Sequence, residues 1–484
     1  MLPHGENVSC STCLYPPKTT MSHGLLAHLQ HALIRIATIA PRLIATPLSQ
    51  PRRASVALII RVKPAVEDEQ WLASKWRSGD VSDEEAHLFP SAVSNAGMTT
   101  EARLRQFFSL QWVQRGSAEL LFIKRADREG DKWSSHVAFP GGRRDEDDED
   151  GVYTAMRETW EEVGIDLAEK EFLQIGHLED REITSSLGKR LLMILSPYVF
   201  LQLSPFSPTP NLQHTEVASL QWVPFSLLFT PTPQWGSLTI NIARHAPQNT
   251  VLQWLFRVLI GRMDFRTIEL PYSPSAIVVP ADQDDSKNGS VASEDGYVTR
   301  IIGPSEREYL AEVSPRLQLW GLTLGMTLDF VSHMCEHRRP EPIPGMSGKL
   351  INKFLEYSPS TWLFGRPAVL TPPRASPSLT EVFPRFQYHD VNFWMWVLGW
   401  RYRVILRNWE NSMGTEMEHN VHWSGLALAA FYASVRRALL VAILLRLIGL
   451  ASVIGITTFL GVRRINRARL GLPGFGINEM IAAK

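Results

Sequence analysis

Three glutamates near residue 160 have the spacing of a metal-binding face on a helix. Glu158, Glu161 and Glu162 stand at positions i, i+3 and i+4, so a helix places all three carboxylates on one side. Carboxylates that close repel one another, and a bound cation offsets the repulsion. Mg²⁺ and Mn²⁺ prefer such oxygen ligands. The spacing predicts a divalent-metal site, in which Glu158 is either a third ligand or a general base. A solvated helix with surface ion pairs is the alternative.

The predicted helix also has a buried side and a defined end. Its opposite face is formed by five apolar or weakly polar residues, namely Val152, Ala155, Met156, Thr159 and Val163. Such a stripe packs against a core. Gly164 follows where a left-handed residue commonly ends a helix. Arg157 precedes Glu161 by four residues, so we expect it to pair with a carboxylate and fix its direction.

The residues before the helix make the pattern more specific. The chain reads Phe139-Pro140-Gly141-Gly142, then acidic residues from Asp145 to Asp150, then Arg157-Glu158-Thr159-Trp160-Glu161-Glu162-Val163-Gly164. This arrangement resembles the Nudix box, G-x5-E-x7-R-E-U-x-E-E-x-G-U with U apolar. One extra residue before Arg157 and the preceding F-P-G-G resemble the coenzyme A diphosphatase branch. The stretch L-L-F-I-K-R, ending at Arg125, is similar to a second signature of that branch.

The resemblance implies a fold and a set of site residues. The fold is a Nudix α/β/α sandwich with a mixed β-sheet, in the α+β class. The implied ligands of Mg²⁺ or Mn²⁺ are Glu158, Glu161, Glu162 and Glu149. The implied catalytic residues are Glu158, Arg157 and Glu162. The implied substrate-binding residues are Arg125, His136, Phe139, Gly141, Gly142 and Glu216. A structural role in a loop is the alternative for His136 and for Glu216, and a solvated loop is the usual meaning of the acidic run.

The resemblance also implies an activity. It is metal-dependent hydrolysis of the pyrophosphate bond of coenzyme A or acyl-CoA, giving adenosine 3′,5′-bisphosphate and (acyl-)4′-phosphopantetheine. One alternative is hydrolysis of another nucleoside diphosphate derivative, such as ADP-ribose or NADH, because a long insertion can reshape the substrate pocket. An alternative of another class is a catalytically silent, membrane-tethered nucleotide sensor. The intact R-E-x-x-E-E favours an enzyme over a sensor.

Length and composition set the domain organisation. A chain of 484 residues exceeds one compact core, and we expect a Nudix domain over residues 51–336 with insertions at about 67–113 and 225–315. The net charge is zero, which gives no sign of a nucleic-acid partner. The three cysteines form no disulfide framework, and Cys10-x-x-Cys13 has no second pair to complete a zinc site. The chain is expected to be intracellular.

Several secondary-structure elements are expected around the box. Apolar, β-branched runs predict strands at 54–62, 119–124, 172–179 and 191–200. Helices are expected at 82–88 and 101–110 in the first insertion. Trp320-Gly321 is expected to open a final helix that ends near residue 333. Residues 281–296, rich in Asp, Ser, Asn and Gly, are expected to be disordered.

The two ends of the chain have different characters. Residues 1–50 are basic and poor in acids, as in a mitochondrial transit peptide; a disordered leader without function is the alternative. A Pro/Arg-rich linker is expected at 337–390 and a membrane-associated helical region at 391–484. Within it, residues 438–461 contain one charge, Arg446, and a helix of this length spans about 36 Å, enough for a bilayer. A buried helix is the alternative. The mitochondrion fits better than the peroxisome, because no Ser-Lys-Leu-type ending is present.

Overall fold

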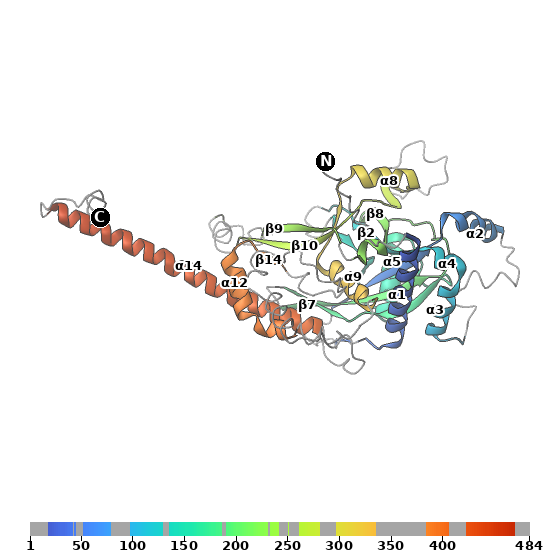
Figure 1. The fold of residues 1–484 in the computed structure, drawn as a ribbon, viewed down its shortest axis with the longest axis horizontal. Coiled ribbons are helices and arrows are strands. Elements are labelled where there is room, and N and C mark those ends of the chain that lie inside the picture. The colour runs from blue at the N-terminus through green and yellow to red at the C-terminus, as the bar shows by residue number, and fades with distance from the viewer. Residues whose placement is uncertain are drawn as a thin grey trace, which may run out of the picture.

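The computed structural model describes residues 18–41, 43–44, 52–78, 97–128, 135–185, 190–230, 233–241, 250, 261–280, 297–334, 384–405 and 423–469. The strands in these residues form a ten-stranded sheet and a separate four-stranded sheet. Helices pack against the larger sheet, and one long helix, α14 (Trp423–Arg469), extends away from the rest of the molecule (Figure 1).

The centre of the larger sheet is β1 (Arg53–Lys63), which is buried along most of its length. It pairs in parallel with β7 (Arg190–Gln202) and antiparallel with β2 (Ser117–Arg125). Strands that are covered on both faces have such continuous apolar runs. The predicted strands at 54–62 and 119–124 are confirmed, and so is the mixed character of the sheet.

Three further strands continue the sheet on either side. β5 (Phe172–His177) and β6 (Arg181–Ser185) both pair antiparallel with β7. β8 (Val217–Pro224) pairs antiparallel with β2. The strands predicted at 172–179 and 191–200 are therefore confirmed, and β6 is an additional strand between them.

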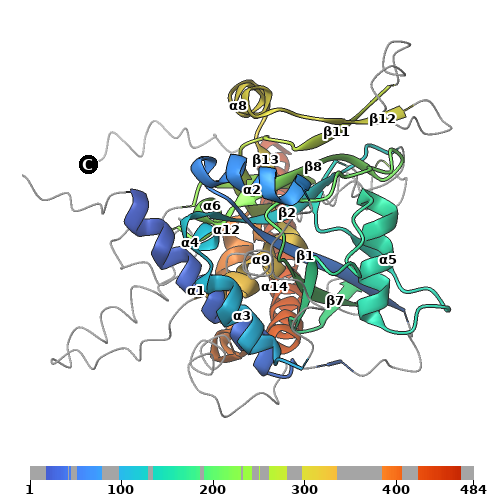
Figure 2. The same ribbon diagram turned by 90° about the vertical axis from the view of Figure 1, so that its right-hand side faces the viewer.

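Helices cover both faces of this sheet. α5 (Gly151–Val163) lies on one face, and α1 (Lys18–Thr38) and α3 (Thr100–Ser109) lie on the other (Figure 2). α9 (Gly321–His333), which follows Trp320, belongs to the same side as α1. The arrangement is the expected α/β/α sandwich, and the predicted helices at 101–110 and after Trp320 are confirmed.

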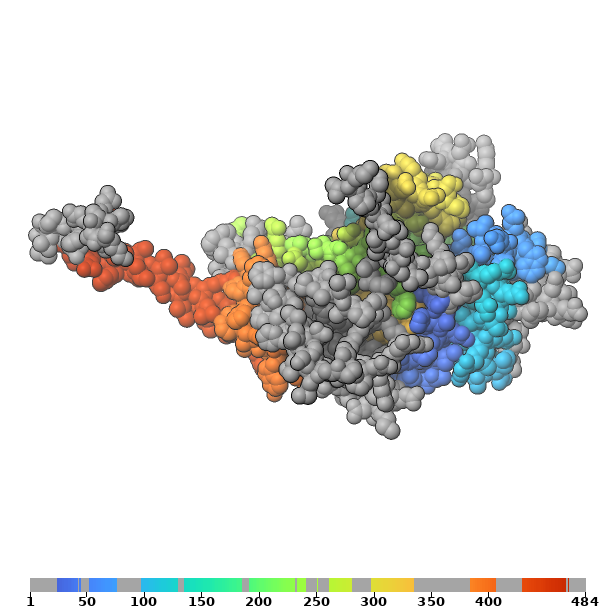
Figure 3. All heavy atoms as spheres, in the orientation of Figure 1, coloured from blue at the N-terminus to red at the C-terminus, as the bar shows by residue number. Residues whose placement is uncertain are grey.

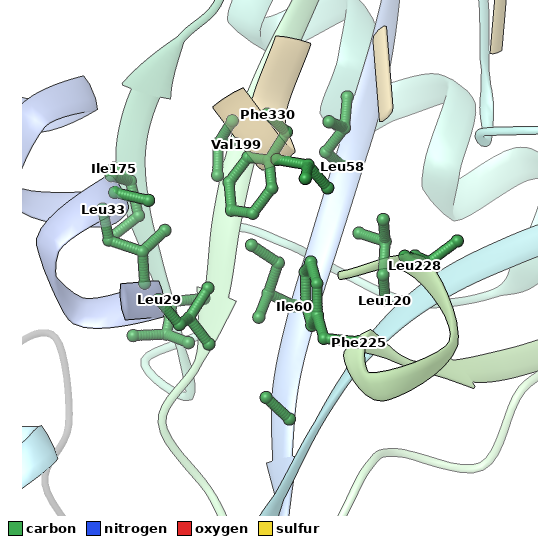
Figure 4. Packing of buried hydrophobic residues seen from close by; sticks show 14 of the residues in the cluster. Leu29, Leu33, Leu58, Ile60, Leu120, Ile175, Val199, Phe225, Leu228 and Phe330 are labelled. Carbon is green, nitrogen blue, oxygen red and sulfur yellow. The ribbon is translucent and has the colours of Figure 1, made fainter. Parts of the chain in front are cut away.

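The core on the α1 side corrects one expectation about the leader. Leu29 and Leu33 of α1 lie beside Ile175 of β5, in the core cluster that also contains Leu58 and Ile60 of β1 (Figure 4). The apolar residues of α1 recur every three or four positions and are buried, which stabilises the helix through tertiary packing. The expectation of a disordered leader over residues 1–50 is therefore wrong for residues 18–38. A transit peptide stays a prediction.

The first insertion is helical where it is described. It contains α2 (Val66–Ser78), α3 and α4 (Gln111–Arg115). Leu104 and Phe107 of α3 are fully buried in the core that α1 also joins. The helix predicted at 82–88 lies outside the described residues.

The second insertion is built into the main sheet. β11 (Ala276–Pro280) pairs with β8, and β12 (Tyr297–Ile301) pairs with β11, so the sheet order becomes β12-β11-β8-β2-β1-β7-β5. The short helix α6 (Phe225–Leu228) precedes these strands, and α8 (Pro304–Val313) follows them. The stretch 281–296, expected to be disordered, lies outside the described residues.

The same insertion forms most of the smaller sheet. β10 (Arg262–Leu270) pairs antiparallel with β9 (Trp235–Asn241), β13 (Leu317–Leu319) and β14 (Arg385–Phe386). β14 lies in the segment expected to be a linker over 337–390. That expectation is wrong for residues 385–386, because their backbone groups complete the edge of β10.

The C-terminal region combines a packed half with an exposed half. α12 (His389–Leu398) contributes Val391 and Met395 to a buried cluster with Phe431 and Val435 of α14. Beyond this cluster, every residue from 447 to 466 is exposed, and the helix extends alone (Figure 3). By length and composition, residues 429–466 are long and apolar enough to cross a membrane.

Candidate active site

Gly141 and Gly142 bring the short strand β4 (Gly141–Arg143) directly against α5. Gly141 has a φ of 145°, and a Cβ there would lie 2.3 Å from the Ser55 carbonyl oxygen of β1. A Cβ on Gly142 would lie 2.3 to 2.4 Å from the Glu158 carboxylate. The absence of a side chain therefore lets Gly141 lie directly against β1 and lets Gly142 lie directly against the Glu158 carboxylate of α5.

Local signals place α5 where the sequence predicts it. The Asp150 carboxylate accepts a hydrogen bond from the Tyr153 amide at 2.8 Å, which caps the first turn. Gly164 has a φ of 69°, and its amide donates to the Trp160 carbonyl at 2.9 Å. The helix end predicted at Gly164 is confirmed. Of the predicted buried stripe, Ala155, Thr159 and Val163 are buried, while Val152 and Met156 are half-buried.

Glu162 is the buried carboxylate of the site. Its side chain is 2% exposed, and Oε2 accepts a hydrogen bond from the Gly141 amide at 2.9 Å. Burial raises the pKa of this carboxyl to about 8 against the lowering effect of the Gly141 amide, and the charges of Glu216 and Glu158 also raise it. Three carboxylates from two separate elements therefore lie within electrostatic reach of one another.

Glu158 and Glu161 occupy the same side of α5 at different depths. Burial raises the pKa of the Glu158 carboxyl, which also feels the charge of Glu216. Glu161 is 54% exposed and accepts a hydrogen bond from Arg157 Nη1 at 2.9 Å, so the predicted pairing of these two residues is confirmed. Among the described residues, no three acidic, His or Cys side chains converge as metal ligands do. Arg157 also binds Glu158, at 3.2 Å, which draws both carboxylates toward the guanidinium.

Asp148 is a structural residue of the site that the sequence did not single out. It is 5% exposed, and its carboxylate accepts hydrogen bonds from Arg157 Nε at 2.9 Å and from Thr154 Oγ1 at 2.9 Å. The hydrogen bonds from Arg157 hold the pKa of Asp148 at about 2. The expectation of a solvated acidic loop is therefore wrong at this position. Six consecutive acids carry no signal that distinguishes the buried one.

The surroundings of these residues match a known domain. Residues 108–239, which include β4 and all of α5, match the family model of the NUDIX domain. The chain contains a Nudix domain. β1 and α1 precede the matched interval and complete its sheet and its core.

Three curated proteins are similar to parts of the chain. An uncharacterized protein of Schizosaccharomyces pombe is 34% identical over 233 residues, which cover 48% of this chain and 59% of that protein. The mitochondrial coenzyme A diphosphatase NUDT8 of Mus musculus is 43% identical over 53 residues, 11% of this chain and 25% of its own length. The protein of that name in Homo sapiens is 38% identical over 79 residues, 16% of this chain and 34% of its own length. The chain thus spans less than two thirds of each relative.

The residues of the Nudix domain fit a hard divalent cation in their chemistry. Glu162 is a buried carboxylate that feels the charges of Glu216, Arg125 and Glu158. The three carboxylates offer only oxygen atoms, which suits Mg²⁺ or Mn²⁺. A buried group of like charges is costly without a cation. Glu149 lies on the exposed acidic loop, where its backbone carbonyl accepts a hydrogen bond from Arg144, and its place among the ligands stays a prediction.

The predicted substrate-binding residues of the Nudix domain separate into two groups. Arg125 ends β2, and its amide donates to the His136 carbonyl at 2.9 Å, so these two residues lie together. The charge of Arg125 also acts on Glu162. Glu216 joins the acidic group and pairs with Arg128 at 3.0 Å. Phe139 is 3% exposed and stacks on Phe122 at a ring distance of 4.9 Å. Its ring therefore packs in the core, and its substrate contact stays a prediction.

Proposed function

We propose that the Nudix domain hydrolyses the pyrophosphate bond of coenzyme A or acyl-CoA, with Mg²⁺ or Mn²⁺, to adenosine 3′,5′-bisphosphate and (acyl-)4′-phosphopantetheine. The observation that carries the hydrolase part is the buried Glu162, held by the Gly141 amide and surrounded by the charges of Glu158 and Glu216. The substrate part is supported by the partial similarity to two proteins named mitochondrial coenzyme A diphosphatase NUDT8.

The proposed roles follow from position and depth. We assign the metal to Glu158, Glu161, Glu162 and Glu149, with Glu158 as the alternative general base. A bound divalent cation neutralises the pyrophosphate and lowers the pKa of an attacking water. Arg157 positions Glu158 and Glu161 through the hydrogen bonds that it donates to them. Gly141 and Gly142 keep the backbone close to the reacting group, and Arg125 and His136 are assigned to the substrate.

We also propose that the exposed half of α14 holds the protein in a membrane. Twenty residues from 447 to 466 are exposed, and a helix of that length spans about 30 Å, the thickness of a hydrocarbon core. Arg463 and Arg464 lie at its far end, and Arg446 at the near end binds Asp390 through three hydrogen bonds of 2.6 to 3.0 Å. The partial similarity to two proteins named mitochondrial coenzyme A diphosphatase NUDT8 supports the mitochondrion as the compartment.

Product analysis by mass spectrometry tests the activity. The full chain in detergent is given Mg²⁺ or Mn²⁺ and, in separate reactions, coenzyme A, ADP-ribose, NADH and ATP. The proposal predicts adenosine 3′,5′-bisphosphate and 4′-phosphopantetheine from coenzyme A, and no products when Glu162→Gln replaces the wild type. Products from ADP-ribose or NADH alone would keep the hydrolase and discard the substrate. Binding of all four without turnover would favour the sensor.

A further inference from the structure

A cavity lies where the Nudix sheet meets the second insertion. It has a volume of about 450 Å³, within the range of small-molecule sites. Lys124 of β2 and His136 before β3 (Val137–Ala138) form one wall. Leu238, Tyr272, Arg316 and Trp320 come from the inserted and following segments and form the other. The cavity therefore exists only because the insertion packs on the domain.

The cavity has the charge of an anion site. Lys124 and Arg316 both line it, and in the described part of the chain neither forms an ion pair with a carboxylate. The Lys124 ammonium lies 5.6 Å from the centre of the Tyr272 ring, which keeps the charge at the cavity wall. Lysine and arginine side chains both bind phosphate groups, so two such cations in the lining suit a phosphorylated ligand.

The cavity also has faces for a planar ring. His136 and Trp320 meet edge to face at 4.9 Å, and Phe265 supports the Trp320 ring from another side at 5.3 Å. With Tyr272, three ring-bearing side chains line one small space. Aromatic rings in such a space stack on nucleobases with little preference for the base.

The insertion is fixed rigidly enough to form a binding wall. The Ser273 amide donates to Gln221 Oε1 at 3.2 Å, and the Ser275 amide donates to the Leu220 carbonyl at 2.7 Å. Both acceptors belong to β8, so Tyr272 is anchored to the Nudix sheet. Leu317, next to Arg316, pairs with Leu270 of β10, which anchors the second cation.

The cavity adjoins the proposed catalytic residues along two strands. Lys124 pairs with Val137, and the next residue of β2, Arg125, donates its amide to the His136 carbonyl. Four residues beyond Val137, the Gly141 amide donates to Glu162. Because the charge of Arg125 also acts on Glu162, the end of β2 lies between the cavity and the carboxylates.

We propose that this cavity binds the phosphorylated-nucleoside half of the substrate, and that the insertion and the segment that follows it determine specificity through Tyr272, Arg316 and Trp320. The inference rests on the proposed function for the diphosphate that links this half to the reacting bond. It assigns recognition to residues outside the Nudix box. The phosphopantetheine half then extends away from the cavity.

Calorimetric titration of the full chain in detergent tests the inference. The probe is adenosine 3′,5′-bisphosphate, with EDTA present so that hydrolysis does not contribute. Lys124→Gln and Arg316→Gln are each expected to raise Kd by about tenfold, as for a lost charge-assisted hydrogen bond. Trp320→Leu is expected to weaken binding as well. The matched control is Arg300→Gln, in the second insertion. The Arg300 side chain pairs with Glu306 at 2.8 Å and does not line the cavity, so the Kd of this variant should equal that of the wild type.

The outcomes separate this inference from the proposed activity. If only the cavity variants lose nucleotide binding, the assignment of the nucleotide to the cavity is supported, even when coenzyme A is not cleaved. The absence of coenzyme A cleavage would then refute only the proposed substrate. The inference is overturned when the wild type does not bind the nucleotide, or when Arg300→Gln weakens binding as much as the cavity variants. It is also overturned when the cavity variants weaken binding of 4′-phosphopantetheine and leave the nucleotide unaffected. Circular dichroism of each variant verifies that it is folded.

Discussion

The Asp148 carboxylate contacts the Arg157 guanidinium at 2.9 Å from Nε and 3.0 Å from Nη2. This buried contact joins the acidic loop to α5. Nη1 of the same guanidinium holds Glu161, and Nη2 also reaches Glu158. The direction of two proposed metal ligands therefore depends on an acidic residue that we do not assign to the metal.

Asp148→Asn is expected to lower both stability and activity. The substitution removes a charged acceptor from a buried arginine, so the free energy of unfolding should fall by about 2 kcal/mol. Asp147→Asn is the matched control, because Asp147 is the exposed neighbour in the same loop, and its effect should stay within about 0.5 kcal/mol. Urea unfolding of both variants measures the difference. Equal stability of the two variants would contradict the role of Asp148.

Glu162→Gln should separate stability from function. Burial raises the pKa of Glu162 to about 8, so at neutral pH the metal-free protein folds at the cost of protonating this carboxyl, and glutamine has no such cost. The metal-free variant should therefore gain thermal stability while hydrolysis is lost. Glu161→Gln, at a site that is 54% exposed, should change the metal-free Tm far less. Thermal unfolding with EDTA and with excess Mg²⁺ measures both effects. A wild-type Tm that does not respond to Mg²⁺, or a Glu162→Gln protein that responds as the wild type does, would contradict the assignment of this ligand.

The two glycines of β4 should respond differently to alanine. Gly141→Ala places a Cβ against the backbone of β1 at a positive φ, and we expect a loss of more than about 3 kcal/mol. Gly142→Ala places its Cβ against the Glu158 carboxylate, which can rotate away. That variant should remain folded and lose activity. The far-ultraviolet circular dichroism and turnover of both variants distinguish the cases, and full activity in Gly142→Ala would argue against a role for Glu158.

Ending the chain after Leu447 should release the protein from membranes. This truncation removes the exposed apolar half of α14 and keeps Phe431, Val435 and Arg446, which contact the α12 region. The shortened protein should therefore remain folded and active in the soluble fraction. Sedimentation with membranes after a carbonate wash measures the release. Persistent sedimentation of the truncated protein would show that another surface holds the membrane.

The sequence predicted the elements whose signals are local. α5 has an amphipathic stripe, a capping aspartate and a terminal glycine within fifteen residues, and β1 has one uninterrupted apolar run. Such patterns depend only on the spacing of apolar residues and on the residues at the ends of an element.

The features that the sequence did not predict depend on distant partners. The apolar stripe of α1 has the same period in a leader and in a core helix, and the helix is buried because α3, α9 and β5 pack against it. β14 has two residues and forms because β10 has a free edge. Asp148 differs from its acidic neighbours only through Arg157, which lies nine residues later. In each case the contact that decides the structure joins residues of different elements, and the local sequence pattern carries no information about such a contact.

The continuity of α14 has a consequence for how the protein would meet its substrate. One helix runs unbroken from residues packed against α12 to residues exposed on every side. If the exposed half of α14 lies in a bilayer, the globular part of the protein is held at the membrane surface. It then encounters its substrate by diffusion in the plane of the membrane. Acyl chains partition into the same surface, so turnover of long-chain substrates would follow their density per unit area of lipid, and dilution with additional vesicles would slow the reaction at constant total substrate.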